Sequence, residues 1–142
     1  MISQTKGLTE LLDQEFIGFL TAVKEDGQPQ TSPIWYIRDG DDIVIYNRPK
    51  ARRLRSIQTN PQVAFNLRAD TGGRSGVTLE GTAVVEEGLP PAKDFPGYEA
   101  KYDGEIAGLG WTPQSFSDDY PVGLRITVTR VRSWGVDNLL RS

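Results

Sequence analysis

Apolar positions at the start of the chain recur at helical spacing. The residues concerned are Leu8, Leu11, Leu12 and Phe16, which would lie on one face of an α-helix. The period then changes, because residues 16–23 and 31–37 are rich in aromatic and β-branched side chains, which favour strands. Asp26-Gly27 between these segments predicts a type I′ hairpin turn, since glycine readily adopts a positive φ.

Three later segments, residues 61–68, 77–85 and 124–129, alternate between apolar and polar side chains as half-buried strands do. With the earlier segments this makes roughly six strands joined by short turns. The pattern predicts a closed or nearly closed antiparallel barrel. The length of the chain favours one domain over residues 1–142.

Two further features refine the strand prediction. Residues 43–46 are apolar at every position, which predicts a strand that is buried on both faces. Val131 falls out of phase with Val128, which predicts a β-bulge near the end of the last strand.

Between residues 86 and 105 the chain becomes acidic and rich in proline, and we expect a mobile excursion with a helix around residues 94–102. Residues 104–117 predict a loop that ends in a short helical turn starting at Thr112-Pro113.

Composition excludes several kinds of chemistry. The 142 residues include no His and no Cys, so neither a Ser-His-Asp nor a Cys-His nucleophile system can form. Zinc sites of the Cys/His type and His or Cys ligation of haem are excluded as well. If the protein is an enzyme, a bound organic cofactor is the expected source of difficult chemistry. We predict no metal site.

No apolar run approaches the roughly 18 to 20 residues that a membrane span needs. The segment MISQTKGLTELLDQ lacks the charged-then-apolar pattern of a secretory signal. We therefore expect a cytoplasmic protein with no membrane partner.

Positive charge is concentrated in residues 48–55, RPKARRLR, which contain five basic and no acidic side chains in a chain of net charge −3. Pro49 and Asn60-Pro61 predict the two ends of a helix over residues 50–58. Its apolar stripe would contain Ala51, Leu54 and Ile57, with Arg52 pointing outward.

Arg48, Lys50 and Arg53 coincide with the start of this helix, where backbone N–H groups and the helix dipole favour an anion. The alternative is a solvated helix face, which we prefer for Arg52. Nucleic acid is a poor candidate, because the net charge is negative and no second basic stripe extends the contact. A phosphorylated small molecule fits better.

The segment Arg-Pro-Lys-Ala-Arg-Arg-Leu, between the strand of residues 30–37 and Asn60-Pro-Gln-Val-Ala64, resembles the flavin and deazaflavin oxidoreductases of the pyridoxamine 5′-phosphate oxidase-like superfamily. The resemblance covers residues 8–85 and resumes weakly over 125–135. It is closest to the actinobacterial branch that uses the deazaflavin coenzyme F-420. It implies a mainly β fold with short helices, an antiparallel split β-barrel, and a homodimer with the cofactor in a groove between the chains.

The resemblance also implies a set of cofactor-binding residues. They are Thr31, Ser32, Pro33, Trp35, Asn47, Arg48, Lys50, Arg53 and Trp111. Lys50 and Arg53 would hold the phosphate with Asn47 and Arg48 beside it, and the segment from Thr31 to Trp35 would line the ring. Residues 108–112 would close the site from the partner subunit. The cofactor carries the hydride chemistry in this family, so no catalytic side chain is implied.

The implied activity is hydride transfer between reduced F-420 and an unidentified conjugated small molecule, such as a quinone or an enone. Two alternatives remain: an FMN-binding oxidoreductase, and a non-catalytic protein that binds or stores F-420 or FMN. Vitamin B6 oxidation and haem degradation are disfavoured, because relatives with those activities use a His that this chain lacks.

Further residues carry weaker expectations. Arg55, Arg68 and Arg74 could hold the oligoglutamate tail of F-420. Trp134 is expected to pack in the core or at an interface. Four tyrosines could donate protons or simply be buried against backbone carbonyls, and these are Tyr46, Tyr98, Tyr102 and Tyr120.

Overall fold

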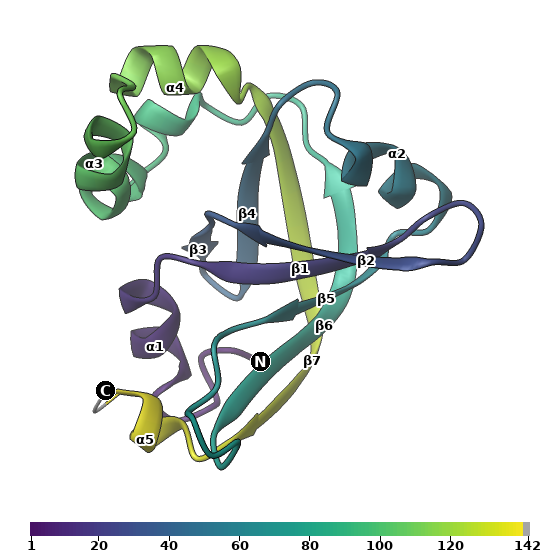
Figure 1. The fold of residues 1–142 in the computed structure, drawn as a ribbon, viewed down its shortest axis with the longest axis vertical. Coiled ribbons are helices and arrows are strands. Elements are labelled where there is room, and N and C mark those ends of the chain that lie inside the picture. The colour runs from purple at the N-terminus through teal and green to yellow at the C-terminus, as the bar shows by residue number, and fades with distance from the viewer. Residues whose placement is uncertain (141–142) are drawn as a thin grey trace.

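A computed structural model describes residues 1–140. Its centre is a seven-stranded, curled antiparallel sheet with the order β2-β1-β5-β6-β7-β4-β3 (Figure 1). The strands are β1 (Gly18–Val23), β2 (Pro29–Ile34), β3 (Ile37–Asp39), β4 (Asp42–Asn47), β5 (Gln62–Asn66), β6 (Gly76–Val85) and β7 (Val122–Trp134). The helices are α1 (Leu8–Gln14), α2 (Arg52–Thr59), η1 (Ala92–Asp94), α3 (Tyr98–Gly108), α4 (Pro113–Asp119) and α5 (Val136–Leu140). The predicted mainly β fold is confirmed, with seven strands in place of roughly six.

The main core lies inside the curled sheet. It contains the apolar faces of the alternating strands, such as Val63 and Phe65 of β5, and the apolar stripe of α1. The N-terminal helix is therefore confirmed, but it ends before Phe16, which is exposed. Removal of these apolar surfaces from water is the main force that closes the sheet.

The first hairpin differs from the predicted type I′ turn. That turn needs a positive φ at both central residues, but within residues 1–140 no residue other than glycine has a positive φ. Instead, the Gly27 N–H donates to the Lys24 carbonyl, the Lys24 N–H donates to the Gln28 carbonyl, and Gly27 has a φ of 90°. This is the longer hairpin loop in which glycine takes the left-handed position after a tight turn.

The predicted β-bulge is confirmed in the β6–β7 pair. Glu80 lies opposite Arg130 and Gly81 lies opposite Val128, so Thr129 is the extra residue. The insertion explains why Val131 falls out of phase with the earlier apolar positions of β7.

The segment between β6 and β7 is a packed helical unit and not the mobile excursion that the sequence predicted. The helix expected around residues 94–102 is confirmed in part, because α3 begins at Tyr98. A second cluster, here called the aromatic core, packs η1, α3 and α4 against one face of β4. The helix α3 runs to Gly108, so residues 104–108 are helical and not a loop. The helical turn after Thr112-Pro113 is confirmed as α4, and Thr112 caps it through its side chain.

The aromatic core also accounts for the apolar strand β4. Ile43 and Ile45 belong to the main core, whereas Val44 and Tyr46 belong to the aromatic core. Burial on both faces is therefore confirmed, and contacts within one chain produce it.

The helix α2 begins later than predicted. It starts at Arg52 with Ala51 at its N-cap, and Pro49 lies in the preceding turn rather than in the first helical turn. Leu54 and Ile57 are buried as expected, and the helix ends at Thr59 with Asn60 as its C-cap. Among the described residues, no helix is long and apolar enough to cross a membrane.

Candidate functional site

The basic segment forms one wall of a group of cavities between α2 and the aromatic core. Arg48, Lys50 and Arg53, with Ala51 and Tyr120, line a cavity of about 340 Å³, here called the cationic cavity. Within residues 1–140 none of the five cations of residues 48–55 forms an ion pair. Unpaired cations around one cavity favour an anionic ligand.

Arg53 has the most constrained side chain of this group. Its Nε donates to Oδ1 of Asn47 at 2.5 Å. Asn47 is fully buried, and its amide nitrogen donates to the carbonyls of Ile45 and Val122. Burial lowers the pKa of Arg53 from its usual value, but a guanidinium remains charged at neutral pH. The orientation of the cation is thus held by a neutral, buried amide.

Arg48 contacts the aromatic core. Its guanidinium lies 4.8 Å from the centroid of the Tyr120 ring, a distance at which a cation is attracted to the ring face. Interaction with the Tyr120 hydroxyl raises the pKa of Arg48. Lys50 is exposed beside it.

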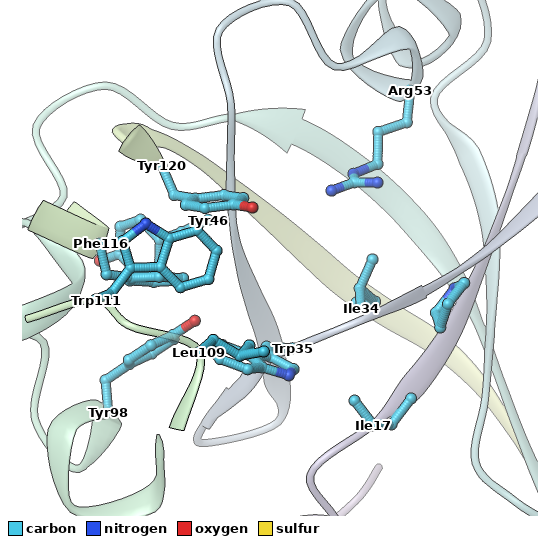
Figure 2. Close-up of a pocket in the computed structure, with 11 residues that line it drawn as sticks. Ile17, Ile34, Trp35, Tyr46, Arg53, Tyr98, Leu109, Trp111, Phe116 and Tyr120 are labelled. Carbon is cyan, nitrogen blue, oxygen red and sulfur yellow. The ribbon is translucent and has the colours of Figure 1, made fainter. Parts of the chain in front are cut away.

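A second cavity of about 340 Å³, here called the aromatic cavity, adjoins the first, since Arg53 and Tyr120 line both. Figure 2 shows Arg53 reaching from α2 toward rings that gather on the opposite side. The lining residues are Ile17, Pro33, Ile34, Trp35, Tyr46, Arg53, Tyr98, Leu109, Trp111, Phe116 and Tyr120. Such flat, apolar walls suit a planar conjugated ring.

The two tryptophans predicted at the site both line this cavity and also pack against the protein. The ring of Trp35 stacks on Tyr102 at 4.8 Å and on Phe116 at 5.3 Å. The Trp111 Nε1–H donates to Asp119 at 3.0 Å. Trp111 lines this cavity together with Trp35 and Arg53 of the same chain. Closure of the site by residues 108–112 of a partner subunit stays a prediction.

The β2 residues divide between different surroundings. Pro33 lines the aromatic cavity, and Ser32 lines a smaller cavity of about 150 Å³ that also contacts Arg53. The Thr31 hydroxyl instead lies 2.7 Å from that of Thr21 on the neighbouring strand, and Thr31 lines none of the three cavities.

The three arginines proposed for a cofactor tail do not gather. Arg55 is exposed on α2, whereas Arg68 is bound to Glu15 and to the Leu139 carbonyl. Arg74 lies in the β5–β6 connection, at the opposite end of the molecule from α2 (Figure 1). The geometry leaves only Arg55 near the site.

Two of the tyrosines are held by carbonyls, as the sequence suggested. Tyr46 donates to Pro90 at 2.6 Å, and Tyr102 donates to Phe16 at 2.6 Å. Burial raises the pKa of Tyr46 to about 12 and raises that of Tyr102 as well, so neither is suited to give up a proton at neutral pH. Trp134 is not a core residue, because it is 48% exposed and covers Gly76.

Sequence reasoning missed Phe116 and Tyr120 as cavity residues; Tyr120 was expected only as a possible proton donor or a buried tyrosine, yet it joins the two large cavities. Leu109, which also lines the aromatic cavity, lies within residues 108–112, the loop that the resemblance singled out. No local signal places Tyr120 or Phe116 at the cavity, because their position depends on how α4 packs against η1, α3 and β4.

The chain belongs to the pyridoxamine 5′-phosphate oxidase family, whose model matches residues 5–135. The fold is similar to the crystal structure of the conserved hypothetical protein Rv2991 from Mycobacterium tuberculosis, with 26% identity and a TM-score of 0.75 over 97% of this chain and 89% of that one. It is also similar to a solved F420 reductase, with 24% identity and a TM-score of 0.67 over 87% and 94% of the two chains. HutZ from Vibrio cholerae, described as a haem storage protein, is 18% identical, with a TM-score of 0.63 over 90% and 92%. No curated protein matches the chain.

The residues present fit a phosphorylated flavin or deazaflavin. The cationic cavity offers Arg48, Lys50 and Arg53 to a phosphate, and the adjoining aromatic cavity offers flat walls to a ring. The match to the family model and the similarity to the solved structures establish the split-barrel fold of this family.

Proposed function

We propose that the protein is an oxidoreductase that binds coenzyme F-420 and transfers hydride between the reduced cofactor and a conjugated small molecule. The observation that carries the proposal is the junction of the cationic and aromatic cavities at Arg53 and Tyr120. Arg48, Lys50 and Arg53 would bind the phosphate, while Pro33, Trp35 and Trp111 would line the ring. When bound, the deazaflavin supplies the hydride chemistry, and the protein's part is to bind, orient and exclude water.

F-420 is favoured over FMN because the overall resemblance of the sequence is closest to the F-420-using branch, whereas the basic motif by itself does not choose between the two cofactors. One solved structure with this fold is also an F420 reductase. FMN remains the alternative cofactor, because the phosphate site and the flat walls would serve it equally well.

The first test is a fluorescence titration of the purified protein with oxidised F-420 and, separately, with FMN. We expect micromolar or tighter binding of F-420. Lys50→Ala and Arg53→Ala should each weaken it roughly tenfold or more, because each removes a charge-assisted hydrogen bond. Arg130→Ala is the control and should bind normally, because Arg130 is an exposed cation on β7 that lines none of the three cavities. Binding of neither cofactor would refute the proposal.

Turnover separates an enzyme from a storage protein. Reduced F-420 is mixed with a panel of quinones and enones, and the protein should accelerate its oxidation. Tight binding without acceleration would favour the non-catalytic alternative. Oxygen-dependent reoxidation of bound FMN would favour the flavin alternative.

We also propose a homodimer, as the resemblance implies. Phe16, Ile17 and Phe19 leave neighbouring apolar side chains exposed at the start of β1, where a second copy could cover them. Sedimentation of the same preparation should give twice the chain mass, and a monomer at all concentrations would contradict this part of the proposal.

A further inference from the structure

The aromatic cavity is lined mostly by apolar and aromatic residues, including three tyrosines, and carries a charge at one point. Among the described residues that line it, Arg53 is the only charged side chain, and the opposite walls are the rings of Trp35, Trp111, Phe116 and Tyr120. Figure 2 shows its guanidinium facing the space between these rings. The cavity therefore has a positive charge at one edge, whereas its other walls carry no charge.

The guanidinium is held without being neutralised. Its Nε is engaged by the Asn47 amide oxygen, a neutral acceptor. Within residues 1–140 no carboxylate forms an ion pair with it. A guanidinium has five N–H donors, so the terminal nitrogens retain donors for a ligand. Their planar arrangement matches a carboxylate or two neighbouring oxygens.

This arrangement distinguishes two kinds of flat ligand. A neutral conjugated ring would gain contact with the aromatic walls. A ring of the same shape with a negative charge at one edge would gain these contacts and also charge-assisted hydrogen bonds from a partly desolvated cation. The second kind should therefore bind more tightly.

We propose that the aromatic cavity selects a planar conjugated ring that carries an anionic oxygen or a delocalised negative charge at one edge, and that Arg53 is the residue that selects it. The inference rests on the proposed function in one respect, because only that function gives the bound ring a part in hydride transfer. The ring could be that of the cofactor or that of the substrate, and the chemistry that Arg53 recognises is the same in both.

Calorimetric titration of the cofactor-free protein with 2-naphthoate and with 2-naphthamide tests the selection. The two probes have nearly the same shape and differ in charge. The naphthoate should bind roughly tenfold to hundredfold more tightly, as expected for a charge-assisted hydrogen bond. Arg53→Gln should abolish the preference, and the matched control Arg52→Gln should keep it.

A second variant leaves Arg53 and Asn47 untouched, in case loss of their hydrogen bond unfolds the protein. Leu109 lines the cavity and is 64% exposed, so Leu109→Glu adds a negative charge at little cost in packing. It should weaken naphthoate binding and spare naphthamide. Equal affinities of the two probes in the wild type, or a preference that survives in Arg53→Gln, would overturn the proposal.

Titration of naphthoate at saturating F-420 identifies the source of the ring. Inorganic phosphate at saturation is the control, because Arg53 also lines the cationic cavity. Competition by F-420 but not by phosphate would assign the aromatic cavity to the cofactor ring, and simultaneous binding would assign it to the substrate; both outcomes support the selection by Arg53. Competition by phosphate would place naphthoate in the cationic cavity and overturn the proposal. If neither F-420 nor FMN binds, the proposed function fails while the preference for naphthoate is still measured. The two failures are thus distinguishable.

Discussion

At the scale of single residues, Lys101 of α3 is a partly buried titratable group outside the cavities. Its Nζ lies 3.8 Å from the centroid of the Tyr36 ring and donates to the carbonyls of Leu12 and Tyr36. Burial lowers its pKa from 10.5 to about 8. One ammonium group thereby connects the end of α1, the β2–β3 link and α3.

The lowered pKa predicts a pH dependence of stability. Between pH 8 and 10.5 the unfolded chain keeps a proton on Lys101 that the folded protein has lost, so the free energy of unfolding should rise with pH in this window. The rise is at most roughly 3 kcal/mol, at about 1.4 kcal/mol per pKa unit. Urea unfolding across this pH range should show the rise in the wild type. The control variant Lys93→Met, which makes the same substitution at another lysine, should show the same rise. A Lys101→Met variant with an unchanged slope would contradict the assignment.

At the scale of elements, the β6–β7 pair shows what alternation along a strand can reveal. The position of Val131 indicates that a bulge exists, because apolar side chains must stay on the buried face of a strand. It does not indicate which strand pairs with β7 at the bulge. Gly81 lies opposite the bulge, where an added Cβ would be 2.1 Å from the Thr127 carbonyl oxygen, so only a glycine fits.

We therefore expect Gly81→Ala to lower the free energy of unfolding by about 1–3 kcal/mol, as forced overpacking does. Gly104→Ala is the matched control, since an added Cβ there meets nothing within 4 Å in the interior of α3. That variant should gain about 0.5–1 kcal/mol from helix propensity. Urea denaturation of both variants measures the difference. A Gly81→Ala protein as stable as the wild type would disprove the close approach.

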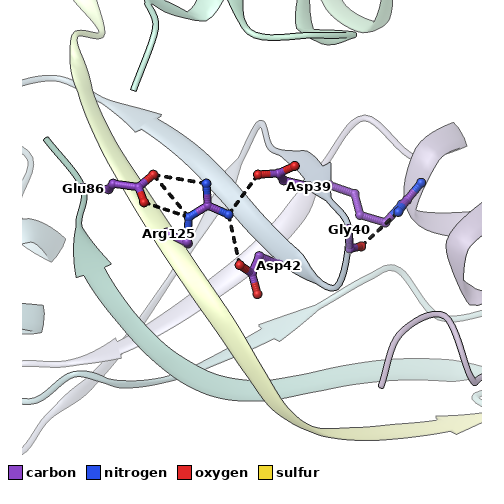
Figure 3. A network of polar contacts seen from close by, with 6 residues as sticks. Asp39, Gly40, Asp42, Glu86 and Arg125 are labelled. Carbon is purple, nitrogen blue, oxygen red and sulfur yellow. Dashed lines mark hydrogen bonds and ion pairs between the residues drawn. The ribbon is translucent and has the colours of Figure 1, made fainter. Parts of the chain in front are cut away.

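At the scale of the whole molecule, Arg125 joins segments that are distant in sequence. On β7, it forms ion pairs with Asp39 and Asp42 at 3.0 Å and with Glu86 at 3.1 Å (Figure 3). The β3–β4 hairpin and the start of the helical segment are thus tied to one guanidinium, and its hydrogen bonds to these carboxylates, chiefly Glu86, raise the pKa of Arg125. This network stabilises the edge of the sheet on which the aromatic core rests.

Arg125→Met should cost about 2 kcal/mol of unfolding free energy, between the values for exposed and for fully buried pairs, because three carboxylates lose their shared cation. Arg132→Met removes an exposed pair with Glu80 at 3.8 Å and should cost less than about 1 kcal/mol. Thermal unfolding of the two variants checks the contrast. Equal losses would show that the Arg125 network contributes no more than an ordinary surface pair.

The sequence by itself determined the elements and the chemistry that they carry. Alternation identified the strands, the apolar stripe identified α2, and the segment of residues 48–55 identified the cationic cavity, because burial and charge follow local periodicity. The absence of His and Cys excluded whole classes of mechanism.

Only the tertiary structure decided how these parts meet. It packed η1, α3 and α4 against β4, placed Tyr120 beside Arg48, and turned Arg53 toward both large cavities. The physical reason is that such contacts join residues far apart in the chain, and their energies depend on the shape of the folded core. The local periodicity of the sequence therefore does not reveal these contacts.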